Sequence, residues 1–211
     1  PACVRFGDAV LIDALSIDHM KWFRDRFHDT KIIVSALGGH SDGVFCPVRP
    51  GLIVTTYDYK AHFADTIFKG WEIVYTDNNS WEQSKHVTGK INKMLTKTKN
   101  KWYVEGEEDN DEFTEFVETW LTDWVGYVEE TVFDVNVLVL DEHHVCVSNK
   151  NNEKVNTFLK KHKMEPVYVP WRHRYFWDGG LHCITLDLLR EGNQQDYFPD
   201  RKKPVTDIGF I

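Results

Sequence analysis

The fold is decided by one segment, Val137 to Val169, which has the sequence VLVLDEHHVCVSNKNNEKVNTFLKKHKMEPVYV. Two strand-like apolar runs, Val137–Leu140 and His144–Val147, are separated by a short polar turn, a pattern typical of a hairpin. Apolar residues then recur at helical spacing over Glu153–His162, and a last apolar run follows at Pro166–Val169. The segment therefore predicts a ββαβ unit, in which a helix connects the hairpin to a parallel strand.

Two earlier segments repeat this order of hairpin partner, opening strand, helix and closing strand. The predicted elements of the first unit are Cys3–Arg5, Ala9–Ile12, Ile17–Phe27 and Lys31–Val34. Those of the second unit are Val44–Cys46, Leu52–Thr55, Ala61–Phe68 and Glu72–Tyr75. Opening and closing strands begin 22, 20 and 22 residues apart in the three units, which indicates a structural repeat. A further strand, Cys183–Leu186, is expected to begin a unit that the chain does not complete.

Units that each bury only one face must stack on one another, as an open solenoid or as a closed ring. We therefore expect an α+β fold in a single domain over residues 1–211. The opening strands of the first two units begin 43 residues apart, whereas those of the second and third begin 92 apart. This difference predicts an inserted, largely helical segment at about 78–126, which forms either solvated helices that cap the core or a lid over the functional site.

The composition fits a soluble globular protein, with 42% hydrophobic and 27% charged residues. A formal net charge of -8 argues against nucleic acid or an anionic membrane as the main partner, and no apolar run approaches the length of a membrane span. Four cysteines in a chain of 211 residues do not indicate a disulfide framework, so we expect reduced thiols and a cytoplasmic location. Three of them, Cys3, Cys46 and Cys146, fit small core positions on apolar strands.

Two further motifs contain candidate catalytic residues, and each follows a glycine pair. Cys183 comes three residues after Gly180 in the pair Gly179-Gly180, and His40 directly follows Gly38-Gly39. Glycine pairs let the backbone turn sharply and let a substrate approach closely. Nucleophilic cysteine chemistry needs an ionisable thiol and a histidine that moves protons, and the two residues can be far apart in sequence.

The repeat predicts that these motifs meet. His40 lies 12 positions before the opening strand of its unit, and the same offset in the third unit falls beside Glu130. Cys183 lies where the hairpin of the incomplete unit would begin. We therefore expect His40, Asp42, Glu130 and Cys183 at one end of the stacked units.

Four segments resemble signatures of the glycine/inosamine amidinotransferases. The cysteine motif spans Gly179–Gly192, the His-x-Asp motif His40–Asp42 precedes Pro50–Val54, and the other two segments are Asn136–Glu142 and Val4–Gly7. The resemblance covers nearly the whole chain apart from the insertion. It implies the pentein fold, a propeller of five ββαβ modules around a central axis, of which this chain would hold an incomplete, C-terminal portion.

The resemblance also implies an activity and residue roles. Cys183 would attack the guanidino carbon of an arginine-like donor, while His40 would protonate the departing amine and then deprotonate an amine acceptor. Asp42 would hold the planar guanidinium, and Glu130 is the second substrate-binding candidate. The expected reaction is amidino transfer through a cysteine-bound intermediate, with small-molecule partners, no cofactor and no metal. A homo-oligomer is left open.

Two departures from the family pattern bear on this expectation. The aspartate that orients the histidine in the family would lie upstream of Pro1, so we expect the chain to be part of a longer protein and to turn over weakly alone. Glu129, Glu130 and Tyr59 stand where the family has serines and an arginine around the substrate, which leaves the acceptor amine open. The alternatives are a guanidino hydrolase (a deiminase) of the same fold and a non-catalytic pentein fragment or binding module.

Overall fold

A computed structural model provides the structure of the protein. It describes residues 3–7, 9–13, 17–28, 30–35, 41–56, 68, 70–76, 104, 106–107, 109–121, 134–171, 179–192 and 195–199.

The described residues form three three-stranded sheets with the strand orders β1-β2-β3, β4-β5-β6 and β7-β8-β9. In each sheet the first two strands pair antiparallel and the last two pair in parallel. The strands are β1 Cys3–Phe6, β2 Ala9–Asp13, β3 Lys31–Ser35, β4 Phe45–Arg49, β5 Leu52–Thr55, β6 Glu72–Tyr75, β7 Leu138–Val139, β8 His144–Val147 and β9 Glu165–Tyr168. The three predicted hairpins and the three predicted parallel pairings are therefore confirmed.

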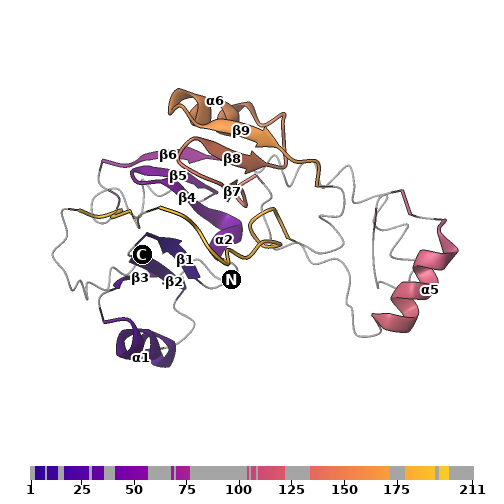
Figure 1. Ribbon diagram of the computed structural model, residues 1–211, viewed down its shortest axis with the longest axis horizontal. Helices are drawn as coiled ribbons and strands as arrows, with labels where there is room; N and C mark the ends of the chain where they lie inside the picture. The colour runs from indigo at the N-terminus through magenta and orange to yellow at the C-terminus, as the bar shows by residue number, and fades with distance from the viewer. Residues whose placement is uncertain are drawn as a thin grey trace.

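Helices connect the parallel strands of the first and third sheets, as the repeat predicts. They are α1, Ile17–Arg26, and α6, Glu153–Lys161. Helix α6 begins after Asn152, whose side chain accepts a hydrogen bond from the backbone of Val155 at 3.1 Å and so caps the helix. The helix predicted over Ala61–Phe68 lies outside the described residues, apart from Phe68 itself. Figure 1 shows α1 and α6 on the outer sides of the first and third sheets.

Several predicted boundaries differ by one or two residues. Val44 belongs to a short helix, α2, Ser41–Val44, rather than to β4. Strand β7 is shorter than predicted because the chain turns tightly on both sides of it: the Val137 amide bonds the Val135 carbonyl at 2.7 Å, and the Leu140 amide bonds the His144 carbonyl at 3.0 Å. Strand β9 begins one residue earlier than predicted.

The predicted strand Cys183–Leu186 is wrong, because this segment forms a turn that continues irregularly. Its backbone amides bond within the loop instead of in a ladder, with Ile184 N on the Gly180 carbonyl at 3.4 Å and Thr185 N on the His182 carbonyl at 3.2 Å. The Cys183 amide donates to the side-chain oxygen of Asn136 at 3.1 Å. Apolar composition predicted a strand, but tertiary contacts override local preference here.

The first core is a cluster of aromatic rings around Phe6, which is fully buried in β1. Its ring centroid lies 5.4 to 6.0 Å from those of Phe45, Phe68, Trp71, Tyr197 and Phe198. Aromatic rings bury large apolar areas, so this cluster joins the first sheet to the second and to residues 195–199.

Gly7 allows residues 195–199 to approach β1 this closely. It forms an antiparallel bridge with Asp196, and its φ of +58° lies in the left-handed region that favours glycine. A Cβ on Gly7 would lie 1.9 Å from the backbone oxygen of Gln195, a distance that no side chain tolerates. The motif Val4–Gly7 therefore has a packing role in this structure.

The second core lies between the second and third sheets. Its buried residues are Cys46, Val48, Leu52, Val54, Val135, Val137, Val145, Val147, Val155, Phe158, Leu159 and Met164. Because strands β4 and β5 contribute to both clusters, the second sheet packs against the first and the third. This packing brings α2 of the second unit close to the segment that enters β7.

The insertion contains one described helix, α5, Asp111–Trp120. Asn110 caps it by accepting a hydrogen bond from the Phe113 backbone at 3.0 Å, and Val117 is its buried residue. Figure 1 shows α5 at one end of the long axis, apart from the three sheets. Among the helices in the described part of the chain, none has both the length and the apolar character to cross a membrane.

Candidate active site

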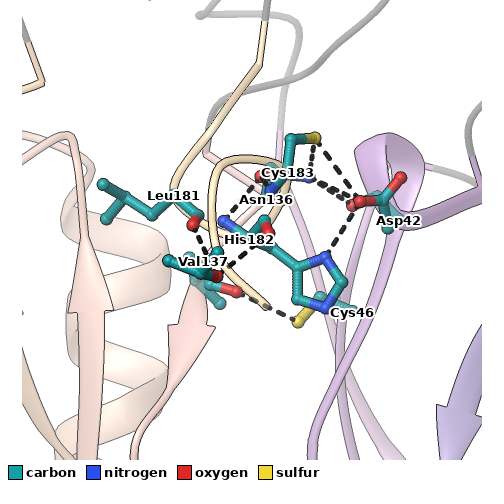
Figure 2. Close-up of polar contacts among 8 residues, drawn as sticks. Asp42, Cys46, Asn136, Val137, Leu181, His182 and Cys183 are labelled. Atoms are coloured by element: carbon teal, nitrogen blue, oxygen red, sulfur yellow. Dashed lines mark hydrogen bonds and ion pairs between the residues drawn. The ribbon is translucent and has the colours of Figure 1, made fainter. Parts of the chain in front are cut away.

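A polar cluster forms where three segments distant in sequence meet. Asp42 comes from α2, Asn136 immediately precedes the β7 hairpin, and His182 and Cys183 lie in the loop that follows Gly179-Gly180. Figure 2 shows these side chains directed toward one another. Asp42 and Cys183 are 141 positions apart in sequence, so only the stacking of the units brings them together.

Asp42 is the acid of this cluster, and its two oxygens differ. Oδ2 accepts hydrogen bonds from Nδ1 of His182 at 2.9 Å and from Sγ of Cys183 at 3.4 Å. Oδ1 is buried and has no hydrogen-bond partner among the described residues. A buried carboxylate oxygen without a donor is unfavourable, so this atom can take a donor from a ligand.

Burial alone would raise the pKa of Asp42. Hydrogen bonds from His182, Cys183 and Asn136, together with the charge of His182, outweigh burial and hold the pKa of Asp42 below its ordinary value. Asp42 is therefore ionised at neutral pH and presents a negative charge beside the thiol.

Asn136 is fully buried and links the other members of the cluster. Its Oδ1 accepts the backbone amides of His182 at 2.9 Å and of Cys183 at 3.1 Å. Its Nδ2 donates to the backbone oxygen of Asp42 at 2.9 Å and also lies 3.1 Å from Sγ of Cys183. One side chain thus contacts both the acid and the thiol.

Gly180 is required for this close approach. A Cβ at Gly180 would lie 2.4 Å from Oδ1 and 2.5 Å from Cβ of Asn136, well inside van der Waals contact. The neighbouring Gly179 is held by Trp171, whose indole Nε1 donates to its carbonyl at 2.6 Å. The glycine pair therefore serves tight packing of the cysteine loop as well as the turn itself.

The rest of the loop is anchored to β7. Leu181 is buried, and the hydroxyl of Thr185 donates to its carbonyl at 3.0 Å. Further along, Nη2 of Arg190 donates to the backbone oxygen of Val139 at 2.7 Å. Cys183 is therefore held from both sides of its loop.

Cys183 is an exposed thiol, whereas Cys46 and Cys146 are buried, as predicted for core cysteines. Cys3 is also exposed, so the prediction that it is a core residue is wrong: it occupies the first, outward-facing position of β1. Although the residue is exposed overall, its sulfur is partly buried. This burial and the negative charge of Asp42 raise the pKa of Cys183, while hydrogen bonds from Gly180 and Asn136 lower it in part. The thiol is therefore protonated near neutral pH in the protein without substrate.

Of the four predicted site residues, the structure brings Asp42 and Cys183 together. His40 and Glu130 lie outside the described residues, although His40 is adjacent in sequence to Ser41, the first residue of α2. The prediction missed Asn136 and His182. The available signals were their places in the sequence, since Asn136 opens one of the four motifs and His182 directly precedes Cys183. Within the described ranges, no group of three or more His, Cys, Asp or Glu residues is arranged to hold a metal ion.

The chain is similar in sequence and in structure to known amidinotransferases. No family model matches the chain. The mitochondrial glycine amidinotransferase of Xenopus laevis is 38% identical over 64 residues, which are 30% of this chain and 15% of that protein. An amidinotransferase of the saxitoxin biosynthetic pathway from Microseira wollei has a similar structure, with a TM-score of 0.59 at 21% identity over 93% of this chain and 46% of that one.

The inosamine-phosphate amidinotransferase from Streptomyces griseus is also similar in structure, with a TM-score of 0.57 at 18% identity. The alignment covers 93% of this chain and 47% of that one, so the chain spans less than half the length of the amidinotransferases that it matches. The resemblance inferred from the four motifs is confirmed: amidinotransferases are similar to this chain in sequence over about a third of its length and in structure over 93% of it.

Proposed function

We propose that this chain carries the nucleophile of an amidinotransferase-like enzyme, which transfers an amidino group from an arginine-like donor to an amine acceptor. The observation that supports this function best is the pairing of Asp42 with Cys183. One oxygen of the Asp42 carboxylate is buried without a hydrogen-bond partner among the described residues, and the other lies 3.4 Å from the sulfur of Cys183.

A guanidinium ion fits the chemistry of this pair. It is planar, permanently charged and carries paired N–H donors, which match the two oxygens of a carboxylate. Oδ1 of Asp42 would gain a donor, which no described residue provides. The bound cation would also offset the negative charge that raises the pKa of Cys183, so substrate binding would favour the reactive thiolate.

The proposed reaction proceeds in two half-reactions. Sγ of Cys183 forms a bond to the guanidino carbon, the C–N bond to the donor amine breaks, and His40 gives the departing amine a proton. An acceptor amine then gives a proton to His40 and attacks the same carbon, and the S–C bond breaks to release the thiolate. The roles of His40 and Glu130, the latter as a substrate ligand, rest on the motif resemblance.

We also propose that the ββαβ units surround a central axis as in a pentein propeller, with the cluster facing that axis. The free state of the described cysteines fits the proposed cytoplasmic location. Small guanidino and amine molecules are the proposed partners.

The test is the covalent intermediate. A version of the chain with its natural N-terminus is incubated with arginine, its intact mass is measured, and free amino acids are quantified. Amidino transfer predicts a mass increase of one amidino group on Cys183 and release of ornithine, with neither in Cys183→Ala. Release of ammonia and citrulline would instead identify a hydrolase. No adduct, combined with a Cys183 thiol that alkylates no faster than buried Cys46, would overturn the enzymatic proposal and favour a binding module.

A further inference from the structure

We propose that Asn136 is a positioning residue that fixes the backbone of Cys183 and donates a hydrogen bond to its thiolate. The inference rests on the proposed function in one respect, namely that Cys183 is the nucleophile. It is carried by the contacts of the Asn136 side chain, which Figure 2 shows between the cysteine loop and Asp42.

The acceptor side of Asn136 fixes the loop. Its Oδ1 receives two consecutive backbone amides, those of His182 at 2.9 Å and Cys183 at 3.1 Å. Two amides bound to one oxygen restrict the backbone on both sides of the His182 Cα, including the peptide that leads into Cys183. The sulfur therefore starts from a defined position, which a nucleophile needs for attack.

These contacts also fix which end of the amide is oxygen. Backbone N–H groups donate and cannot accept, so the atom that faces the two amides is Oδ1. The nitrogen then faces acceptors, which are the backbone oxygen of Asp42 at 2.9 Å, Sγ of Cys183 at 3.1 Å and Oδ2 of Asp42 at 3.4 Å.

Nδ2 carries two hydrogens for these acceptors. The shortest contact, to the backbone oxygen of Asp42, uses one of them. The second hydrogen faces the sulfur and the carboxylate oxygen, and in the neutral thiol state these two already share the S–H proton. When Cys183 loses that proton, its negative sulfur becomes a strong acceptor for the second hydrogen.

The surroundings prevent the side chain from leaving this position. Asn136 has no solvent exposure, and Gly180 packs against it so closely that a Cβ at Gly180 would lie 2.5 Å from its Cβ. The amide group therefore stays in place beside the partly buried sulfur, where a hydrogen bond is stronger than it is in water. The same hydrogen bond lowers the pKa of Cys183 against the opposing charge of Asp42.

The test separates the two halves of the amide by replacing it with Asp. Asn136→Asp keeps the shape and the oxygen that binds the loop amides, but it replaces the donor to sulfur with a carboxylate oxygen, whose negative charge also raises the pKa of Cys183. Alkylation of Cys183 by iodoacetamide is followed against pH by peptide mass mapping, in a Cys3→Ser background because Cys3 is also exposed. We expect the midpoint of the alkylation rate of Cys183 against pH to rise by about one pH unit or more. Below that midpoint the thiolate fraction would then be roughly tenfold lower.

Asn151→Asp is the matched control, because it makes the same change at an exposed turn before α6 and should leave the midpoint unchanged. A folded Asn136→Asp protein with the unaltered midpoint would overturn the proposal. If that variant does not fold, the unsubstituted protein provides the measurement: the NMR resonance of the Asn136 side-chain amide should shift as Cys183 titrates. No shift, compared with Cys183→Ala, would also overturn the proposal.

These readouts do not depend on amidino transfer. Rapid alkylation of Cys183 without an arginine adduct would contradict the proposed function and leave the role of Asn136 standing. An arginine adduct together with identical alkylation profiles in the parent and Asn136→Asp would support the proposed function and overturn the role of Asn136.

Discussion

Nδ1 of His182 lies 2.9 Å from Oδ2 of Asp42, so an imidazole binds the same carboxylate oxygen that the Cys183 thiol approaches at 3.4 Å. The His182 side chain is half exposed, whereas that of Asp42 is nearly buried. A guanidinium that uses both oxygens of Asp42 would therefore share Oδ2 with His182 or displace it toward solvent. His182 is thus placed to influence both the charge of Asp42 and the access of a substrate.

Replacement of His182 should change how stability depends on pH. The pKa of Asp42 is lowered in the folded protein, so its ionised form contributes stability above its ordinary pKa of about 3.9, and this contribution is lost as the pH falls through the lowered value. His182→Ala removes the main hydrogen bond that lowers this pKa. We expect a loss of about 1 kcal/mol in the free energy of unfolding near neutral pH, a value reduced for the exposure of His182.

Urea unfolding at a series of pH values measures this effect. The difference between His182→Ala and the parent should shrink as the pH falls below about 4. His143→Ala, which removes an exposed histidine on the β7–β8 turn, serves as the control. A constant difference at every pH would mean that His182 acts by packing and not through Asp42.

Replacement of Asp42 should have opposite effects on two reactions of Cys183. Asp42→Asn removes a charge that raises the pKa of Cys183, so alkylation of the unliganded protein near neutral pH should become faster, roughly tenfold for each unit by which the pKa falls. Formation of the arginine adduct should become slower, on the order of a hundredfold, because the partner of the guanidinium is lost.

Both rates are measured at Cys183 by peptide mass mapping in the Cys3→Ser background, with Asp25→Asn on the exposed side of α1 as the isosteric control. Slower alkylation in Asp42→Asn would show that the carboxylate activates the free thiol and would contradict the charge relationship described here.

Phe6 should be a major determinant of stability. Its ring is fully buried among five other aromatic rings, so Phe6→Ala is expected to lower the free energy of unfolding by about 3–5 kcal/mol. Trp120→Ala is the control, because that side chain is 74% exposed and should change stability by less than about 0.5 kcal/mol. Chemical denaturation of both variants gives the comparison, and equal losses would disprove the importance of the ring cluster.

Cys46 should remain unreactive in the folded protein. Burial, with a further contribution from the charge of Asp42, raises the pKa of Cys46 to about 12, and its sulfur faces the Val137 carbonyl at 3.8 Å. Iodoacetamide near neutral pH should therefore modify Cys183 and leave Cys46 unmodified until denaturant is added. Mass mapping of both cysteines checks this, and modification of native Cys46 at the rate of Cys183 would contradict the packing of the second core.

The strands could be predicted from the sequence because their pattern is local. The bounds of β5, β6 and β8 agree with the apolar runs, since each run is flanked by turn residues and pairs with neighbours in the same unit. The run that begins at Cys183 looks the same in sequence but forms a turn. Its conformation depends on Asn136, which lies 47 residues away in sequence and accepts hydrogen bonds from the amides of the loop.

The candidate site was predictable only in part, for a similar reason. The motifs and the repeat predicted that Asp42 and Cys183 would be close, since each residue type has a recognisable chemical use. Asn136 and His182 carry no such signal, because an asparagine at the start of a hairpin and a histidine in a loop have many ordinary explanations. Their involvement became visible only through distances between side chains of separate segments.

The contact between Phe6 and Phe198 has a consequence for how the chain folds as it is synthesised. The rings that cover Phe6 include Tyr197 and Phe198, which leave the ribosome roughly 190 residues after β1. Until then the nascent first sheet keeps an aromatic surface only partly covered. Long-range contacts of this kind form slowly, and the uncovered rings leave the chain open to aggregation until they form.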